Sequence, residues 1–130
     1  MKILITGCGR HSKTLVEYLK NNPDNIPVEI ISINNSERNI LRTGVDEYHI
    51  APSIFAPEYI EWLRNLCEEK GVDVILPYIT AELPIAAANR EYLEEKGTKV
   101  SVASLDSLMV ANNKVEMAKM FPQYMPKQIV

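Results

Sequence analysis

The stretch KILITGCGRHSK at residues 2–13 constrains the fold most strongly. An apolar run, Ile3-Leu4-Ile5, leads directly into Gly7-Cys8-Gly9 and then into a helical pattern. This order is typical of a buried strand, a tight glycine turn and a helix N-terminus at the start of an α/β fold. Ligands in such folds bind beyond the carboxyl ends of the strands, where helix N-termini attract anions. The stretch therefore predicts where a ligand site lies without identifying the ligand.

Strand-like and helix-like segments alternate along the whole chain. Runs rich in Val and Ile predict strands at residues 2–6, 28–33, 47–50, 72–76 and 99–103. A periodicity near 3.6 residues and terminal glycines predict helices at residues 12–22, 37–42, 57–70, 81–96, 106–111 and 114–120. Such alternation implies βαβ crossovers. We therefore expect an α/β fold, a Rossmann-like three-layer sandwich with a parallel sheet of about five strands in the order 3-2-1-4-5.

Length and composition exclude several classes of protein. The 130 residues are enough for one domain with its own core. The net charge of −3 lacks the excess of positive charge that is typical of nucleic-acid-binding proteins. The apolar runs are too short to span a membrane, and no secretory signal pattern precedes the first strand. Cys8 and Cys67 form no CxxC motif, and His11 and His49 lack metal-ligand spacing. We expect a cytoplasmic protein with reduced cysteines, no metal site, and no nucleic-acid or membrane partner.

Two loops are expected to face each other across the sheet edge. In the order 3-2-1-4-5 the topology reverses between the first and fourth strands, which brings residues 7–11 and 77–82 to opposite walls of one crevice. The candidate substrate-binding residues in these loops are Gly7, Gly9, Arg10, His11, Thr80 and Glu82. The alternatives are that the glycines only form the turn, that the other loop residues are ordinary surface residues, and that Glu82 only favours the start of the next helix. No catalytic residue is predicted.

The glycine loop departs from the dinucleotide-binding pattern at two places. The third glycine of that pattern would stand at position 12, where this chain has Ser12. The acidic residue that closes the second strand and holds the ribose is replaced by Asn34 and Asn35. An NAD(P)-binding oxidoreductase domain nevertheless stays one alternative. A non-enzymatic α/β interaction module, for instance a dimeric one, is another.

A third candidate element is Asn112-Asn113-Lys114-Val115-Glu116 near the C-terminus. Asn113 and Glu116 have the spacing of a capping box, which predicts a helix that begins at Lys114. A lysine at the first helical position opposes the helix dipole unless an anion lies nearby. Lys114 is therefore a candidate anion ligand, and the alternative is a solvated surface lysine.

These elements carry a family resemblance. The stretches are ILITGCGR, EYIEWLRNLCEEKGVDVILP with its continuation TAEL, NREYLEEKGTKVSVAS and NNKVEMAKMF. In this order they resemble the N-terminal (pre-ATP-grasp) domain of ATP-grasp ligases, most closely that of proteins similar to the large subunit of carbamoyl-phosphate synthase. They cover almost the whole chain, and residues 34–56 match only loosely.

The resemblance implies roles for particular residues. Lys114 would reach ATP, although Asn113 precedes it where the family has aspartate. Thr80 stands where the family often has an acidic residue, whereas Glu82 is kept. The glycine loop would form a substrate surface and not an NAD site.

The resemblance also implies an activity and a domain organisation. The full enzyme would use ATP and Mg²⁺ to join a carboxylate to an amine or ammonia, and it would bind a small-molecule carboxylate or amine. Residues 1–111 would form the pre-ATP-grasp domain, and residues 112–130 the start of a linker to an ATP-grasp domain that follows Pro126. Ile129-Val130 looks like the beginning of a strand. We therefore expect a fragment that is inactive alone and needs an ATP-grasp domain in cis or on a separate chain; a homodimer is a further expectation.

Overall fold

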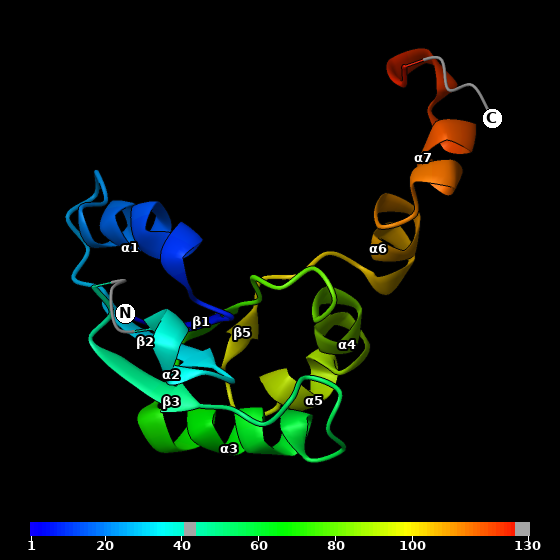
Figure 1. The fold of residues 1–130 in the computed structure, drawn as a ribbon. Helices are drawn as coiled ribbons and strands as arrows, with labels where there is room; N and C mark the ends of the chain where they lie inside the picture. Colours follow the sequence, from blue (N-terminus) through cyan, green and yellow to red (C-terminus); the bar gives the residue numbers. More distant parts are fainter. Residues whose placement is uncertain (41–43, 127–130) are drawn as a thin grey trace.

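A computed structural model describes residues 1–40 and 44–126, apart from the side chains of residues 10, 39 and 40 (Figure 1). Its strands are β1 (Lys2–Thr6), β2 (Glu29–Asn34), β3 (Glu47–Ile50), β4 (Val74–Leu76) and β5 (Lys99–Val100). They form one sheet in the order β3-β2-β1-β4-β5, and all neighbouring strands are parallel. The predicted fold class and strand order are confirmed.

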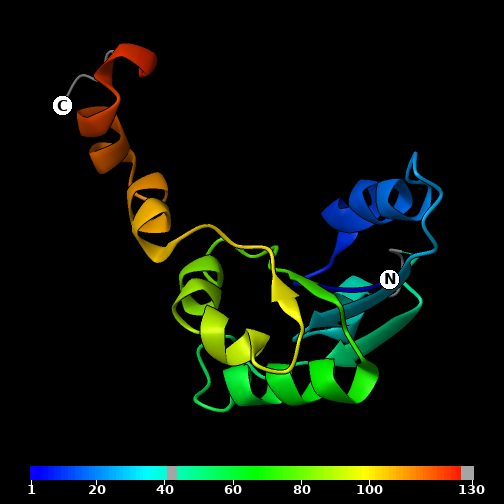
Figure 2. The same cartoon turned by 180° about the vertical axis from the view of Figure 1, so that it is seen from behind.

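Helices cover both faces of this sheet. The helical segments are η1 (Arg10–Ser12), α1 (Lys13–Lys20), α2 (Glu37–Ile40), α3 (Tyr59–Lys70), α4 (Leu83–Ala88), α5 (Arg90–Glu94), α6 (Leu105–Ala111), α7 (Lys114–Met120) and η2 (Pro122–Tyr124). Figures 1 and 2 show α1 on one face and α3, α4 and α5 on the other, which gives the expected three layers. Within the described ranges, no helix is both long and apolar enough to cross a membrane.

Some elements differ from their predicted bounds. The single helix expected over residues 81–96 is two helices, α4 and α5, which are separated at Asn89. The side chain of Asn89 donates to the carbonyl of Ile85 (2.8 Å), a local bond of the kind that competes with regular helical hydrogen bonding. The last strand stops at Val100, three residues before its predicted end. Two other expectations, the helical residues 41–42 and the strand start at Ile129-Val130, lie outside the described residues.

Each face of the sheet has its own hydrophobic core. Leu4 of β1 packs on the side of α3, in a cluster that includes Leu63 and Ile75. Ile5, the next residue, points to the opposite face and packs with Val16 of α1. This alternation is the two-residue period of a strand buried on both sides. The central strands are thus packed on both faces, and the loops at their carboxyl ends start from this core.

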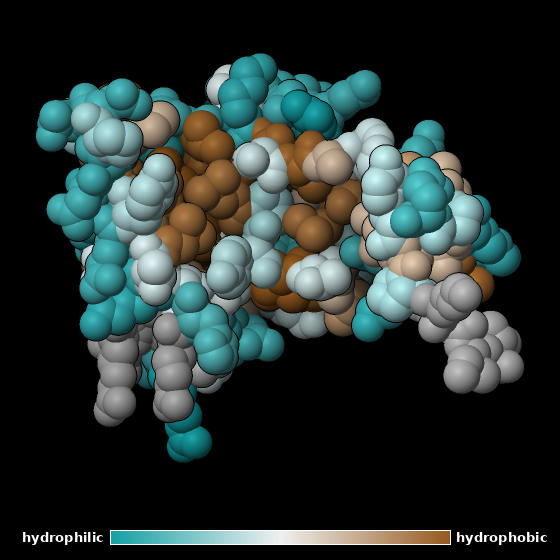
Figure 3. Space-filling view, turned by 90° about the horizontal axis from the view of Figure 1, so that it is seen from above, coloured by the Kyte–Doolittle hydropathy of each residue, from teal (hydrophilic) through white to brown (hydrophobic). Residues whose placement is uncertain are grey.

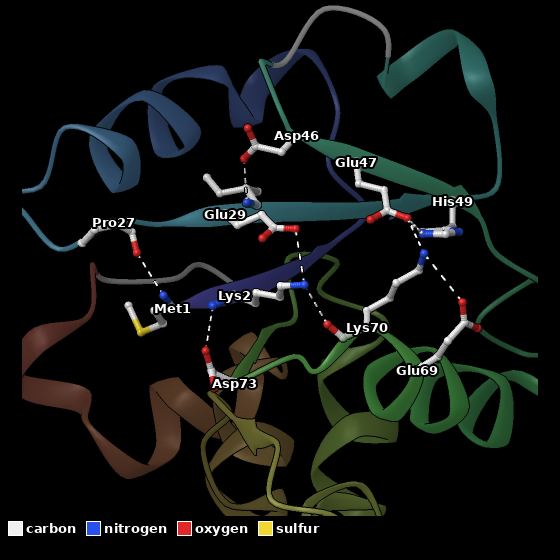
Figure 4. Close-up of polar contacts among 11 residues, drawn as sticks. Met1, Lys2, Pro27, Glu29, Asp46, Glu47, His49, Glu69, Lys70 and Asp73 are labelled. Atoms are coloured by element: carbon white, nitrogen blue, oxygen red, sulfur yellow. Dashed lines mark hydrogen bonds and ion pairs between the residues drawn. The ribbon is translucent and has the colours of Figure 1, made fainter.

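The amino ends of the strands carry a network of charged side chains (Figure 4). The ammonium of Lys2 lies 3.5 Å from Glu29 and donates to the carbonyl of Lys70 (3.0 Å). The backbone N–H of Lys2 donates to Asp73 (2.7 Å), and the ammonium of Lys70 lies 2.6 Å from Glu47. This edge of the sheet is therefore occupied by its own ion pairs.

The C-terminal helices α6 and α7 extend away from the sheet (Figures 1 and 2). Leu108 is the buried residue of α6, and α7 has no buried residue among its described side chains. The predicted helix start is confirmed, because the Asn113 side chain accepts hydrogen bonds from the N–H groups of Val115 (3.1 Å) and Glu116 (3.3 Å). The capping box is formed only in this half, since the N–H of Asn113 donates to the carbonyl of Val110 (3.1 Å). The proposed domain boundary after Ala111 stays a prediction.

Candidate functional site

A cavity of about 260 Å³ lies at the carboxyl ends of four strands. Its wall is formed by Gly7 after β1, residues 33–35 at the end of β2, residues 51–55 after β3, Tyr59 at the start of α3 and Ile79 after β4. This is the edge at which ligands bind in open α/β sheets. The two loops that the sequence predicts to face each other thus meet in this wall through Gly7 and Ile79.

Gly7 is required by the geometry of the turn. It has a φ of +60°, in the left-handed region that side chains disfavour. A Cβ atom at this position would lie 2.2 Å from Cγ1 of Ile79. Both the conformation and the close approach of the loop after β4 therefore demand glycine here.

Gly9 has a different role from Gly7. Its φ of −143° is extended, so its conformation is open to other residues. Its N–H donates to the hydroxyl of Ser12 (3.1 Å), and the N–H of Ser12 donates back to the carbonyl of Gly9 (2.9 Å). The buried Ser12 thus closes the turn, and the N–H of Gly9 already has a partner within the loop.

A buried carboxylate lies behind the cavity. Glu82, immediately before α4, is 0% exposed. It accepts a hydrogen bond from the hydroxyl of Tyr59 (2.5 Å) and another from the hydroxyl of Thr6, which in turn accepts from the N–H of Tyr78 (3.0 Å). Burial raises the pKa of the Glu82 carboxyl, and the hydrogen bonds from Thr6 and Tyr59 oppose that rise. This network joins the ends of β1 and β4 to the start of α3.

Tyr59 belongs to both the network and the cavity wall. Burial, together with the neighbouring Glu82, raises the pKa of Tyr59 far above its ordinary value, so this phenol stays a hydrogen-bond donor. Because Glu82 holds its hydroxyl, the position of the Tyr59 ring is fixed. The network thus sets the shape of the cavity from behind.

The other predicted site residues lie elsewhere on the loops. Thr80 and His11 are exposed and do not line the cavity. The backbone of Arg10 lies in η1, and its side chain is outside the described part of the structure. Glu82 points into the buried network. A role of these residues, and of Gly9, in substrate binding stays a prediction.

Several wall residues were not predicted from the sequence. Asn34 donates to the carbonyl of Cys8 (3.2 Å) and accepts from the N–H of Ser36 (3.2 Å), which ties the end of β2 to the glycine loop. Phe55, in the loop after β3, is 75% exposed beside the cavity. Asn34 ends β2 and Phe55 follows β3, and the carboxyl ends of both strands lie at the same edge as that of β1. That placement is the signal that could have identified them.

Lys114 is remote from this wall. It is exposed at the first position of α7, on the segment that projects from the sheet (Figure 1). Its predicted contact with ATP stays a prediction. In residues 1–40 and 44–126, no group of three His, Cys, Asp or Glu side chains could hold a metal ion.

Solved structures of several enzymes have the same fold. Glycinamide-RNase-transformylase T from Mycobacterium tuberculosis matches with a TM-score of 0.65 at 11% identity, over 96% of this chain and 35% of that protein. N5-carboxyaminoimidazole synthetase from Staphylococcus aureus, complexed with ADP, matches with a TM-score of 0.63 at 16% identity, over 94% and 29%. The biotin carboxylase domain of Hydrogenobacter thermophilus 2-oxoglutarate carboxylase, a dimer with MgADP and bicarbonate, matches with a TM-score of 0.63 at 17% identity, over 94% and 27%. The chain thus spans about a third of these proteins at most.

Sequence comparison identifies the family. No curated protein matches the chain. A family model described as "PylC-like, N-terminal domain" matches residues 3–101, from β1 through β5. The resemblance to the N-terminal domain of ATP-grasp ligases is confirmed, whereas the particular likeness to carbamoyl-phosphate synthase stays a prediction. The chain belongs to the family of PylC-like N-terminal domains.

Proposed function

We propose that this chain is the substrate-side domain of an ATP-dependent ligase that joins a carboxylate to an amine or ammonia. The cavity at the carboxyl ends of β1 to β4, in a chain whose residues 3–101 match the family, is the observation that carries the proposal. ADP or MgADP accompanies two of the structures with this fold, which supports ATP and Mg²⁺ as participants in the full enzyme. Since the chain spans 27–35% of those three proteins, most of the catalytic apparatus would lie outside it.

In such a ligase, ATP would transfer its γ-phosphoryl group to the carboxylate and leave as ADP; the amine would then attack the acylphosphate carbon, displace phosphate and lose a proton to form the amide. Mg²⁺ would neutralise charge on the transferred phosphoryl group. Its ligands would come from the ATP-grasp domain, because the described part of this chain offers no metal-binding cluster. Lys114, exposed at the start of α7, would contact the nucleotide from this domain.

The chain's own contribution would be to bind and orient the substrate. The cavity would hold part of the molecule, and the exposed Thr80 and His11, with Arg10 and Gly9, would contact groups that extend from it. Glu82 would act as a positioning residue, because its hydrogen bonds hold Tyr59, which lines the cavity, and the buried Thr6 at the end of β1. A homodimer and cytoplasmic localisation belong to the same proposal.

The test compares the 130-residue chain with the full product of its native gene. We expect no ADP from the chain alone and, from the full product, ADP formation that needs Mg²⁺ and an acceptor acid. Hydroxylamine should trap the acylphosphate as a hydroxamate, and bicarbonate with ammonia tests the likeness to carbamoyl-phosphate synthase. ATP turnover by the chain alone would contradict the proposal, as would a full product that makes no ADP with any acid in a broad panel.

A matched pair of variants tests the proposed nucleotide contact. In the full product, Lys114→Met should raise KM for ATP, because a cation near the phosphates is lost. Lys119→Met is the control, since Lys119 lies on the same helix and pairs with Glu116 (2.8 Å). Equal KM values for ATP in the two variants would contradict the proposed contact between Lys114 and the nucleotide.

A further inference from the structure

We infer that the cavity takes the uncharged, apolar part of the substrate, an aromatic ring or a branched aliphatic group, while the charged groups of the substrate stay outside. The inference rests on the proposed function, because it assumes that this cavity is the substrate site. It adds the chemical class of the group that is bound there.

The described residues of the cavity wall present mainly hydrocarbon. Ile33, Ile54 and Ile79 contribute aliphatic side chains from three different segments, and Phe55 contributes a ring. None of the described residues that line it is Asp, Glu, Lys, Arg or His. The wall is thus suited to burial of apolar surface, which contributes roughly 25 cal/mol per Å².

Three polar side chains of this wall, those of Tyr59, Asn34 and Ser53, already have hydrogen-bond partners within the protein. The hydroxyl of Tyr59 donates to Glu82, and the amide of Asn34 bonds to the backbone of the glycine loop and of Ser36. The hydroxyl of Ser53 accepts from the N–H of Phe55 (3.3 Å). A carboxylate or ammonium that entered the cavity would lose its water without gaining a partner of opposite charge among these side chains, which is costly.

The size of the cavity fits one ring or one branched side chain. Its volume is about 260 Å³, and an apolar cavity of about 150 Å³ is known to hold benzene. Phe55, 75% exposed beside the opening, offers a surface on which a ring can pack. Asn35, also exposed, supplies an uncharged polar contact there.

The experiment titrates the ¹⁵N-labelled chain with three probes that share one ring: benzyl alcohol, benzoate and benzylammonium. We expect benzyl alcohol to shift the amide signals of Gly7, Asn34 and Ile79 and to bind at least tenfold more tightly than either charged probe. Phe55→Ala should weaken the binding of benzyl alcohol at least threefold. Tyr124→Ala is the matched control, because Tyr124 is 80% exposed on the C-terminal segment and does not line the cavity.

A second variant fills the cavity from inside. Ala51→Leu should abolish the shifts, whereas Ala103→Leu, at an exposed alanine outside the wall, should leave the dissociation constant within twofold. Charged probes that shift the same amides with equal or higher affinity would overturn the inference and leave the substrate site itself intact. If none of the three probes shifts these amides, the cavity is not the substrate site, and that part of the proposed function fails as well.

Discussion

Gly7 is constrained both by its left-handed backbone conformation and by its closeness to Ile79. Gly7→Ala should lower the free energy of unfolding by more than the roughly 1–2 kcal/mol of a left-handed residue, because the new methyl group would overlap Ile79. Urea denaturation measures this loss. Gly71→Ala is the control, since Gly71 has a similar φ of +64° but open space around its Cβ position. Equal losses in the two variants would show that the contact with Ile79 relaxes at no cost.

Glu82 should make the free energy of unfolding decrease as pH rises, which is the opposite of the effect of a carboxylate in an ion pair. Burial raises its pKa above the ordinary 4.5, so the folded state binds this proton more tightly than the unfolded state does. Its contribution to stability is therefore fully present below pH 4.5 and is lost as pH rises through the folded pKa. The unfolding free energy of the wild type, measured relative to that of Glu82→Gln, should fall as pH increases above this value.

The matched control for Glu82 is Glu58→Gln, at an exposed glutamate one residue before α3. This variant removes the same charge at the surface, so the expected result is a decline that is specific to Glu82→Gln. A difference for Glu82→Gln that stays constant with pH would mean that the two hydroxyl donors cancel the effect of burial on the pKa, and one that rises with pH would mean that they outweigh it.

The hydrogen bonds around Glu82 could be predicted only in part from the sequence. The position of Glu82 beside a helix start was visible from local pattern, and so was the turn at Gly7. The partners of Glu82 were not, because Tyr59 lies 23 residues away and Thr6 lies 76 residues away along the chain. Long-range side-chain pairs leave no periodic signal in a single sequence, so a buried positioning role could not be read from it.

At the scale of the elements, the fold was largely predictable. Parallel order follows from alternating strands and helices, and each buried strand showed its apolar run. The break at Asn89 was missed because the alanine-rich stretch before it favours helix, and helical periodicity does not indicate whether a side chain such as that of Asn89 bonds to the backbone four residues earlier. The wall residues at the ends of β2 and β3 were missed because residues 33–36 and 51–55 contain neither a glycine motif nor a charged side chain.

The ion pairs at the amino ends of the strands should add a small, acid-sensitive stability. The ammonium of Lys70 beside Glu47 holds the pKa of that carboxyl below its ordinary value (Figure 4). Its contribution is present above pH 4.5 and is lost as pH falls through the folded pKa. Glu47→Gln should therefore cost up to about 1 kcal/mol at pH 7, the upper end of the range for ion pairs in contact with solvent, and nothing in strong acid.

The control for this pair is Glu68→Gln, because Glu68 faces Lys96 at 3.3 Å with both side chains about half exposed. We expect a smaller loss of unfolding free energy there. If Glu47→Gln costs as much in strong acid as at neutral pH, the side chain acts through packing and not through its charge.

At the scale of the whole molecule, apolar surface is not confined to the cavity. Seen from above, hydrophobic residues gather between the polar surface over α1 and the segment that holds α6 and α7 (Figure 3). A hollow of about 380 Å³ lies between α6 and α7, and Met120 beside it is 56% exposed. These helices therefore contribute little buried surface to the domain.

We therefore expect most of the free energy of unfolding to come from the sheet domain and little of it from the C-terminal segment. A chain that ends at Asn112 lacks α7, which buries no described side chain, and should lose less than about 1 kcal/mol of unfolding free energy. Leu108→Ala should cost about 2 kcal/mol or more, because that side chain is 7% exposed where α6 meets the domain. Urea denaturation of both proteins, with the amide spectrum of the cavity residues as a check on the fold, makes the comparison. A truncation that costs more than Leu108→Ala would show that α7 is an integral part of the folded domain, and the proposed boundary after Ala111 would then be wrong.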